Sequence, residues 1–190
     1  MAAQIIDHIS REIELSEEEK NEFLSILSEV FIPKKEFLIV PNQKIENEYY
    51  VVEGCLKAYY LDEQGDKHII QFAIEDWWIS DFEAFFKNQP SKLYVEALED
   101  SRLLALDHNS LEILYSRIPK FERFFRLKIT NAFVALRERI LSSLQKSNTE
   151  LYLEFCETYP DIEKRVQNYH IANYLGMKPE SLSRIRKELT

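Results

Sequence analysis

Short apolar segments of strand length recur between residues 34 and 107, and they constrain the possible folds more than any other feature. They are rich in Tyr, Val, Ile and Phe: EFLIV, YYVVEG, LKAYYL, HIIQFAI, LYVEALE and RLLALD. Gly54 lies between two of them, where a bulge or tight corner favours glycine. The sequence LDEQGDKH around Gly65 is typical of a hairpin turn. Several short strands at this spacing predict a small barrel or sandwich-like roll, interrupted at 77–92 by a short helix and loop.

Helical periodicity flanks this region on both sides. Ser16 and Glu19 have the spacing of a capping box, and apolar residues at helical spacing follow as far as Val30. Pro119 opens a long helix that runs to about Leu144 without an internal Gly or Pro. Its apolar residues either pack along the strand-rich domain or form a coiled-coil-like seam with a second copy. The apolar spacing near 3.5 residues favours the seam.

The C-terminal segment NYHIANYLGMKPESLSRIRKEL predicts a helix, a tight turn and a second helix. Gly176 suits the residue just after the first helix, where a positive φ is needed. Pro179 suits the first turn of the second helix, where its missing N–H costs nothing. One apolar face can form a shared core: Ile171, Leu175, Leu182, Ile185 and Leu189. Another face is polar and can form hydrogen bonds: Glu180, Ser181, Arg184 and Lys187. This arrangement is typical of a DNA-binding helix-turn-helix, although a helical hairpin with a solvated face remains the alternative.

Charge is distributed unevenly along the chain. The net charge is −9, which by itself argues against a general nucleic-acid binder. Residues 164–190, however, carry a net charge of +4, so the other residues carry −13. A basic end on an acidic body indicates two regions with different partners.

Several classes of site are not expected. The three glycines form no nucleotide-phosphate loop, and the four histidines and two cysteines have no metal-ligand spacing. No hydrolase or metalloprotease motif is present, so we expect no catalytic residues, no metal, no cofactor and no enzyme activity. The sequence also lacks a membrane-length apolar run and a secretory signal, which predicts a cytoplasmic protein without membrane contact.

The tail resembles the helix-turn-helix of Crp/Fnr-family transcription regulators over VQNYHIANYLGMKPESLSRIRKEL. The resemblance implies that Glu180 and Arg184 read bases, and that Ser181 and Lys187, with Asn168, contact phosphates. Pro179 replaces a basic residue that contacts DNA in the catabolite activator protein. The printed sequence stops just after the second helix, at Thr190, so the family's β-hairpin wing is not expected.

The resemblance extends to the strand-rich region, which is similar to the family's cyclic-nucleotide-binding β-roll. The pocket residues differ from those of the cyclic-AMP binders. A Gly-Glu-Leu segment is replaced by Ser80, Asp81 and Phe82, and an Arg-Ser pair is replaced by Ser91 and Lys92. The guanidinium that would clamp the phosphate is therefore missing. We expect a pocket filled by its own side chains or by an unknown apolar effector, with cyclic nucleotide as the alternative.

Together these features predict an α+β fold. A double-stranded β-helix or β-roll sensor with flanking helices spans residues 1–116, a dimerisation helix 117–146 and a helix-turn-helix domain 147–190. The expected function is a homodimeric regulator that binds a palindromic site in double-stranded DNA, with a small-molecule effector and RNA polymerase as further candidate partners. A β-roll module whose tail binds a protein partner is the alternative, and a cupin-type enzyme is disfavoured by the lack of a His/Glu cluster.

Overall fold

The computed structural model describes residues 1–189 and has an α+β fold. Within these residues the strands form two four-stranded antiparallel sheets that pack together as a roll. The first sheet has the order β1-β8-β3-β6: Leu27–Ile32, Ser101–Asp107, Asn47–Glu53 and Trp78–Ile79. The second has the order β2-β7-β4-β5: Phe37–Ile39, Tyr94–Ala97, Leu56–Leu61 and Lys67–Ala73. The predicted roll and its strand-like segments are thus confirmed.

Gly54 forms the corner between β3 and β4, as its position between two strands predicts. Its φ is +112°, a conformation that side chains with a Cβ rarely adopt. A Cβ at this position would lie 2.7 Å from the Cα of Ser101. The backbones of the two segments therefore approach closely enough that only glycine fits.

The N-terminal segment contains one correction to the sequence analysis. The capping box is present, with the Ser16 hydroxyl accepting from the Glu19 N–H at 3.2 Å, but helix α2 (Glu17–Ser25) ends well before Val30. Residues Leu27–Ile32 form β1 instead, paired with β8 along the whole strand. A helical apolar pattern is overridden here because the edge of β8 offers backbone hydrogen bonds and a sheet to pack on.

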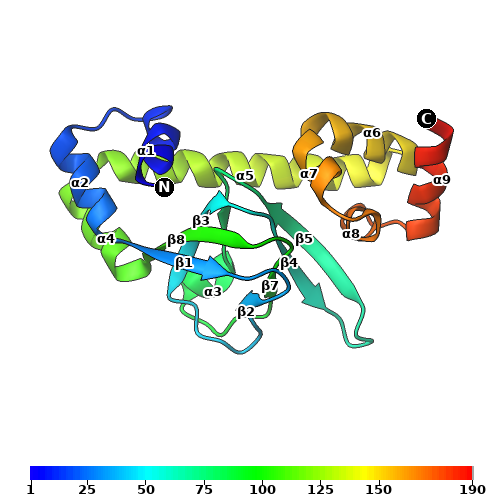
Figure 1. Ribbon diagram of the computed structural model, residues 1–190, viewed down its shortest axis with the longest axis horizontal. Coiled ribbons are helices and arrows are strands. Elements are labelled where there is room, and N and C mark those ends of the chain that lie inside the picture. The colour runs from blue at the N-terminus through cyan, green and yellow to red at the C-terminus, as the bar shows by residue number, and fades with distance from the viewer. Residues whose placement is uncertain (190) are drawn as a thin grey trace.

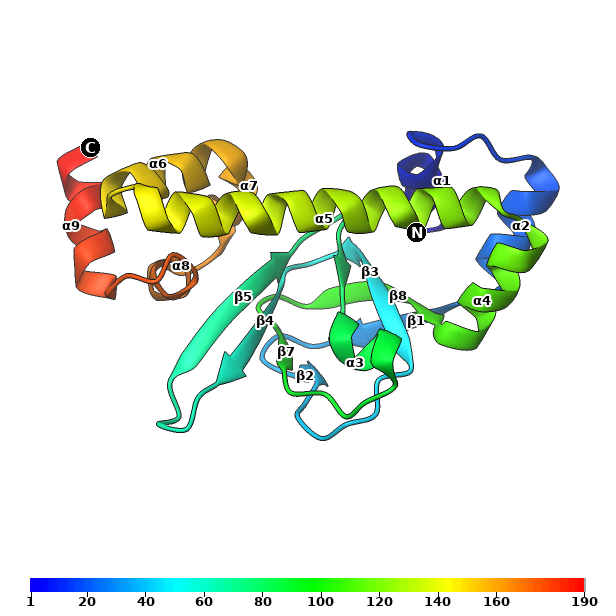
Figure 2. The same ribbon diagram turned by 180° about the vertical axis from the view of Figure 1, so that it is seen from behind.

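Helix α5 (Lys120–Gln145) runs along the roll from one end of the molecule to the other (Figures 1 and 2). At one end it meets the helices α1 (Ala2–Ser10), α2 and α4 (His108–Arg117). Its first turns bury Phe121, Phe124 and Phe125 against these helices and the roll. The short helix α3 (Phe82–Lys87) follows β6, where the sequence predicts a helix and loop.

The remaining helices form a compact group at the other end of α5: α6 (Asn148–Thr158), α7 (Pro160–Arg165), α8 (Asn168–Tyr174) and α9 (Pro179–Leu189). Their apolar core is continuous with side chains of β4, β5 and the corner before β4, including Cys55, Tyr59, Ile69 and Phe72. The helical group is therefore docked on the roll. The expectation about a wing after Thr190 lies outside the described residues.

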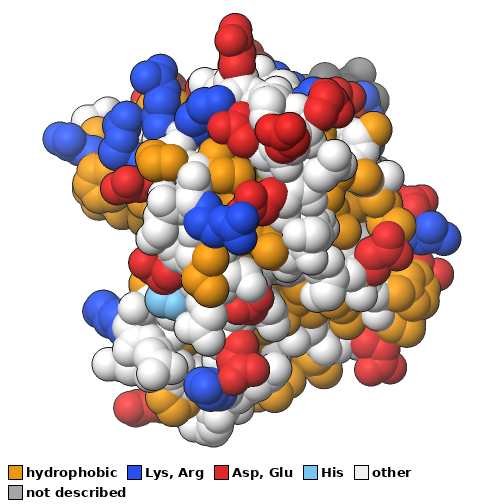
Figure 3. Space-filling model, turned by 90° about the vertical axis from the view of Figure 1, so that its left-hand side faces the viewer, with side chains coloured by type: hydrophobic (Ala, Val, Ile, Leu, Met, Phe, Trp, Pro, Cys, Tyr) orange, Lys and Arg blue, Asp and Glu red, His pale blue; other side chains and the backbone are white. Residues whose placement is uncertain are grey.

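The end of the molecule opposite α9, formed by α2 and α4, exposes acidic, basic and apolar side chains in a mixed pattern (Figure 3). No helix within residues 1–189 has the length and apolar character needed to cross a bilayer. In the same part of the chain, no cluster of three or more His, Cys, Asp or Glu side chains could hold a metal ion.

Candidate functional site

Helices α8 and α9 form the predicted helix-turn-helix. Gly176 ends α8 with a φ of +71°, and the Met177 N–H donates to the Ala172 carbonyl at 2.9 Å, which closes the turn. Pro179 is the first residue of α9, as predicted. Three of the predicted core residues are buried: Ile171, Leu182 and Ile185. Leu175 is partly buried, whereas Leu189 is 50% exposed, so its assignment to this core is wrong. Leu189 is the last residue of α9.

The outer face of α9 carries three of the predicted DNA-contacting residues. Glu180, Arg184 and Lys187 are exposed and lie at i, i+4 and i+7, so their side chains share one face of the helix. Within residues 1–189 none of the three has a hydrogen-bond or ion-pair partner. Ser181 is partly buried in the first turn. This face therefore presents an arginine and a lysine with free donors and a glutamate with free acceptors.

Asn168 occupies a different position from these residues. Its amide nitrogen donates to the Ser183 hydroxyl at 3.0 Å, and its amide oxygen accepts from Arg186 at 3.2 Å. Arg186 also pairs with Glu163 of α7 at 2.6 Å. Asn168 thus joins α8 to α9 and holds the angle between them. The sequence analysis missed this connection because it joins three helices that periodicity treats separately.

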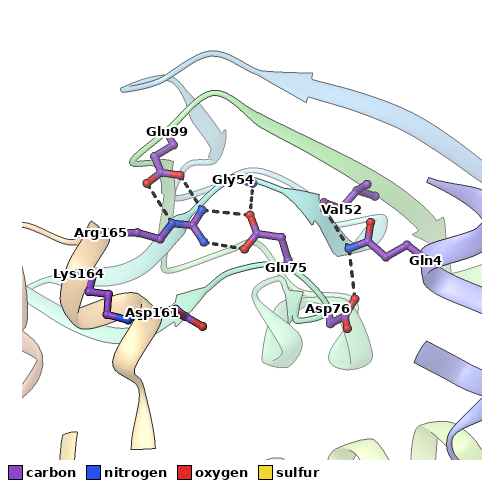
Figure 4. Close-up of polar contacts among 9 residues, drawn as sticks. All are labelled: Gln4, Val52, Gly54, Glu75, Asp76, Glu99, Asp161, Lys164 and Arg165. Carbon is purple, nitrogen blue, oxygen red and sulfur yellow. Dashed lines mark hydrogen bonds and ion pairs between the residues drawn. The ribbon is translucent and has the colours of Figure 1, made fainter. Parts of the chain in front are cut away.

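Arg165, at the end of α7, ties the helical group to the roll (Figure 4). Its guanidinium donates to both oxygens of Glu75, at 2.6 and 3.1 Å, and to both oxygens of Glu99, at 3.2 and 2.6 Å. Glu75 also accepts from the Gly54 N–H at 2.9 Å. Burial by itself would raise the pKa of Glu75, but Arg165 and the backbone hydrogen bonds, including the one from Gly54, together outweigh that effect and lower it. One arginine of the helical group therefore pairs with two carboxylates of the roll.

A second polar contact lies between the β4–β5 hairpin and α8. Lys57 of β4 is 2% exposed, with its Nζ 3.1 Å from a Glu96 oxygen and 3.3 Å from His170 Nε2. Burial, aided by the positive charges of Lys57 and Lys67, lowers the pKa of His170 to about 4. At neutral pH the imidazole is therefore uncharged and can accept a hydrogen bond from the Lys57 ammonium.

The side chain of Asn173 also docks on the roll. It forms hydrogen bonds with the backbone of β5 that a neighbouring strand would otherwise form. Its amide oxygen accepts from the Ile69 N–H at 2.7 Å, and its nitrogen donates to the Lys67 carbonyl at 2.6 Å. β5 is an edge strand, so these backbone groups have no strand partner on that side. These docking residues are missed by the sequence analysis, because the carboxylates, lysine and asparagine involved look like ordinary surface residues.

The predicted effector pocket is closed by its own hydrogen bonds. One oxygen of Asp81 caps α3 by accepting from the Ala84 N–H at 3.1 Å. The other accepts from the Ser91 hydroxyl at 2.9 Å and from the Lys92 N–H at 3.1 Å. Ser80 donates to the Asn47 carbonyl at 2.9 Å. Ser80, Asp81 and Ser91 are all buried.

The other two predicted pocket residues differ from these three. The Lys92 side chain is 69% exposed and lies 3.9 Å from Glu83, so its ammonium is directed to the surface. Phe82 is partly buried and lies beside Lys128 of α5. The structure thus brings Ser91 to Asp81 but keeps the Lys92 ammonium away from them.

Comparison with known proteins agrees with this architecture. Residues 29–117 match the family described as the cyclic nucleotide-binding domain. The fumarate and nitrate reduction regulatory protein of Vibrio cholerae is 25% identical over 166 residues, which cover 81% of this chain and 65% of that protein. This chain therefore matches slightly less than two thirds of the length of that relative.

Solved structures share the fold. The c-di-GMP responsive global regulator CLP of Xanthomonas campestris has a TM-score of 0.74 at 12% identity, with 92% of this chain and 91% of that chain covered. FixK2 from Bradyrhizobium japonicum has a TM-score of 0.72 at 19% identity, with 86% and 84% covered. With its β-roll, its long helix and its helix-turn-helix, the chain is thus similar to transcription regulators of the Crp/Fnr family and shares their fold.

Proposed function

We propose that this protein is a homodimeric, cytoplasmic transcription regulator that binds a palindromic site in double-stranded DNA through α9. The observation that carries the proposal is the outer face of α9, where Glu180, Arg184 and Lys187 are exposed without partners in the described chain. Arginine can bond both major-groove acceptors of guanine, and glutamate can accept from the cytosine amino group. We expect Ser181 and Lys187 to contact phosphates, together with Asn168, which also joins α8 to α9.

The exposed face of α5 supports the proposed dimer. Beyond its buried first turns, the helix exposes a stripe of apolar side chains: Ile129, Phe133, Leu136, Ile140 and Leu144. The first four alternate at spacings of four and three residues, as in a coiled-coil seam. A second copy packed along this stripe would relate two α9 helices by a two-fold axis. Each would then enter one of two successive major grooves about 34 Å apart.

The test of DNA reading is a binding selection on random duplexes with the wild-type protein and Arg184→Ala. The variant is expected to lose preference at one base position of each half-site, at a cost of about 1–3 kcal/mol. Arg102→Ala is the matched control, because Arg102 is an exposed arginine of β8, 3.7 Å from Glu53. Recovery of the wild-type motif with Arg184→Ala would refute the base-reading role. If the wild-type protein retained no DNA fragments at low salt, the alternative would gain support, namely that the tail binds a protein such as RNA polymerase.

We also propose that the β-roll does not bind cyclic AMP. The Asp81 oxygens are already used by Ser91, Lys92 and Ala84, and the Lys92 ammonium lies at the surface beside Glu83. Titration calorimetry with cyclic AMP and cyclic GMP at micromolar concentrations is expected to show no binding heat. A clear 1:1 isotherm would contradict this, and any effector of another chemical class stays a proposal.

A further inference from the structure

A buried ammonium group lies where α5 crosses the roll. The Nζ atom of Lys128 is 2.7 Å from an oxygen of Glu48, which is fully buried in β3. The same nitrogen lies 4.0 Å from the ring centroid of Trp78 and 4.3 Å from that of Phe125. Phe82 of the predicted effector pocket borders the group at 5.8 Å. The Lys128 side chain is only 17% exposed, so this contact lies inside the fold.

Glu48, Trp78 and Phe125 surround the Lys128 ammonium, and we call these three side chains the box. Their chemistry suits an ammonium group. An ammonium carries three N–H donors, and one of them meets a carboxylate while the faces of two aromatic rings surround the charge. The negative face of an aromatic ring attracts a cation, and this attraction grows when water is excluded. The second Glu48 oxygen is buried and has no hydrogen-bond partner within the described residues. Among the described residues, Lys128 is therefore the cation that compensates the negative charge of Glu48.

We infer that Glu48, Trp78 and Phe125, with Phe82 at the rim, form a binding site for a primary alkylammonium, and that Lys128 fills this site from within the same chain. The site adjoins the place where Asp81 and Ser91 close the predicted effector pocket. The Lys128 side chain, which belongs to α5, thus occupies the site and attaches the helix to the roll. This inference concerns the contact between α5 and the roll and does not depend on DNA binding.

The test uses Lys128→Ala in the full chain, which removes the atoms from Cγ to Nζ. n-Propylammonium has the same heavy atoms, so it can replace what the substitution deletes. The variant is expected to have a lower Tm than the wild type, and n-propylammonium chloride should restore most of the loss in a saturable manner. n-Propanol, which lacks the charge, and sodium chloride, which lacks the alkyl group, should not.

Two control variants test whether the response to n-propylammonium needs a buried site and the Glu48 carboxylate. Lys120→Ala removes another lysine of α5, which lies 2.8 Å from Glu19 but is 50% exposed, and this variant should show no saturable response. The double variant Lys128→Ala/Glu48→Gln retains the space but lacks the carboxylate, and it should not respond either.

An equal effect of n-propanol, or an unchanged response in the double variant, would overturn the inference. If Lys128→Ala alone is unfolded, recovery of its near-ultraviolet circular dichroism in n-propylammonium but not in n-propanol supports the site. Failure to recover in n-propylammonium would count against it.

Discussion

The protonation state of His170 is set by the groups that surround it. It lies in α8, yet the groups that face it come from the roll: Lys57, Lys67 and, beyond Lys57, Glu96. A proton on His170 would place a third positive charge beside the two lysines, with one carboxylate to compensate. The His170 ring is therefore neutral, and its Nε2 can accept a hydrogen bond from the Lys57 ammonium.

The lowered pKa of His170 predicts that the docked structure is weakened by acid. The pKa falls from 6.5 in the unfolded chain to about 4 in the folded one, so below pH 6.5 the unfolded state binds more protons. The contribution of neutral His170 to the free energy of unfolding is complete above pH 6.5. It decreases as the pH falls toward 4, by at most about 3 kcal/mol. Thermal unfolding of wild type and His170→Gln between these limits measures it.

The variant should have a flatter pH profile than the wild type over this range, because carboxylates and His8 contribute equally to both proteins. Parallel profiles for the two proteins would show that His170 does not supply this dependence.

Helix α5 illustrates how one element can serve two surfaces. Its first turns are buried, and its later turns expose the apolar stripe, of which Phe133 is 63% exposed and Leu144 is 77% exposed. Exposed apolar area of this extent on one helix face is typical of an interface. Packing along the roll thus holds for the first turns of the helix, and the seam with a second copy stays a prediction for the later turns.

Phe133→Glu is expected to weaken the proposed dimer, because it places a charge at the centre of the apolar stripe. Loss of a buried aromatic side chain costs about 2 kcal/mol or more, so the dimer Kd should rise at least about tenfold. Sedimentation equilibrium measures this change. Asn131→Glu, an exposed position two residues before Phe133 and off the stripe, should leave the Kd unchanged. Equal effects of the two substitutions would place the interface elsewhere.

At the scale of the whole molecule, the C-terminal helical group is held against the roll by a few polar contacts around a small apolar core. Arg165 bridges Glu75 and Glu99, and Asn173 covers the free edge of β5. A regulator of this kind can change state only through contacts that differ between its states. If this protein has a second state, these contacts are where we expect it to differ.

Arg165→Ala is expected to loosen the docking, since Glu75 and Glu99 would then face each other without a cation. Both carboxylates are partly exposed, so solvent screening limits the cost to about 1–2 kcal/mol. The Ile69 amide donates to Asn173, and its hydrogen exchange should speed up about tenfold.

Lys164→Ala is the matched control, because Lys164 is the adjacent cation and lies 3.9 Å from Asp161 with both side chains about 70% exposed (Figure 4). It should leave the Ile69 exchange rate unchanged. Unaltered exchange in Arg165→Ala would mean that the ion pairs do not hold the domains together.

Much of the fold could be predicted from local patterns. The strands around Gly54, the turn at Gly176 and the start of α9 at Pro179 follow from residue types with narrow backbone preferences. The exposed face with Arg184 follows from helical spacing. β1 could not be predicted, because its apolar residues fit a helix equally well and only the pairing with β8 selects the strand.

By itself, the sequence determined the strand-rich roll, the turn between α8 and α9 and the exposed polar face of α9, because turns, caps and helical faces depend on neighbours a few positions apart. Only the tertiary structure decided that Asp81 bonds to Ser91, that Arg165 bridges two glutamates and that Lys128 enters an aromatic box. These contacts join residues from separate elements. A side chain's charge and pKa depend on what surrounds it in space, and that arrangement is absent from any local pattern.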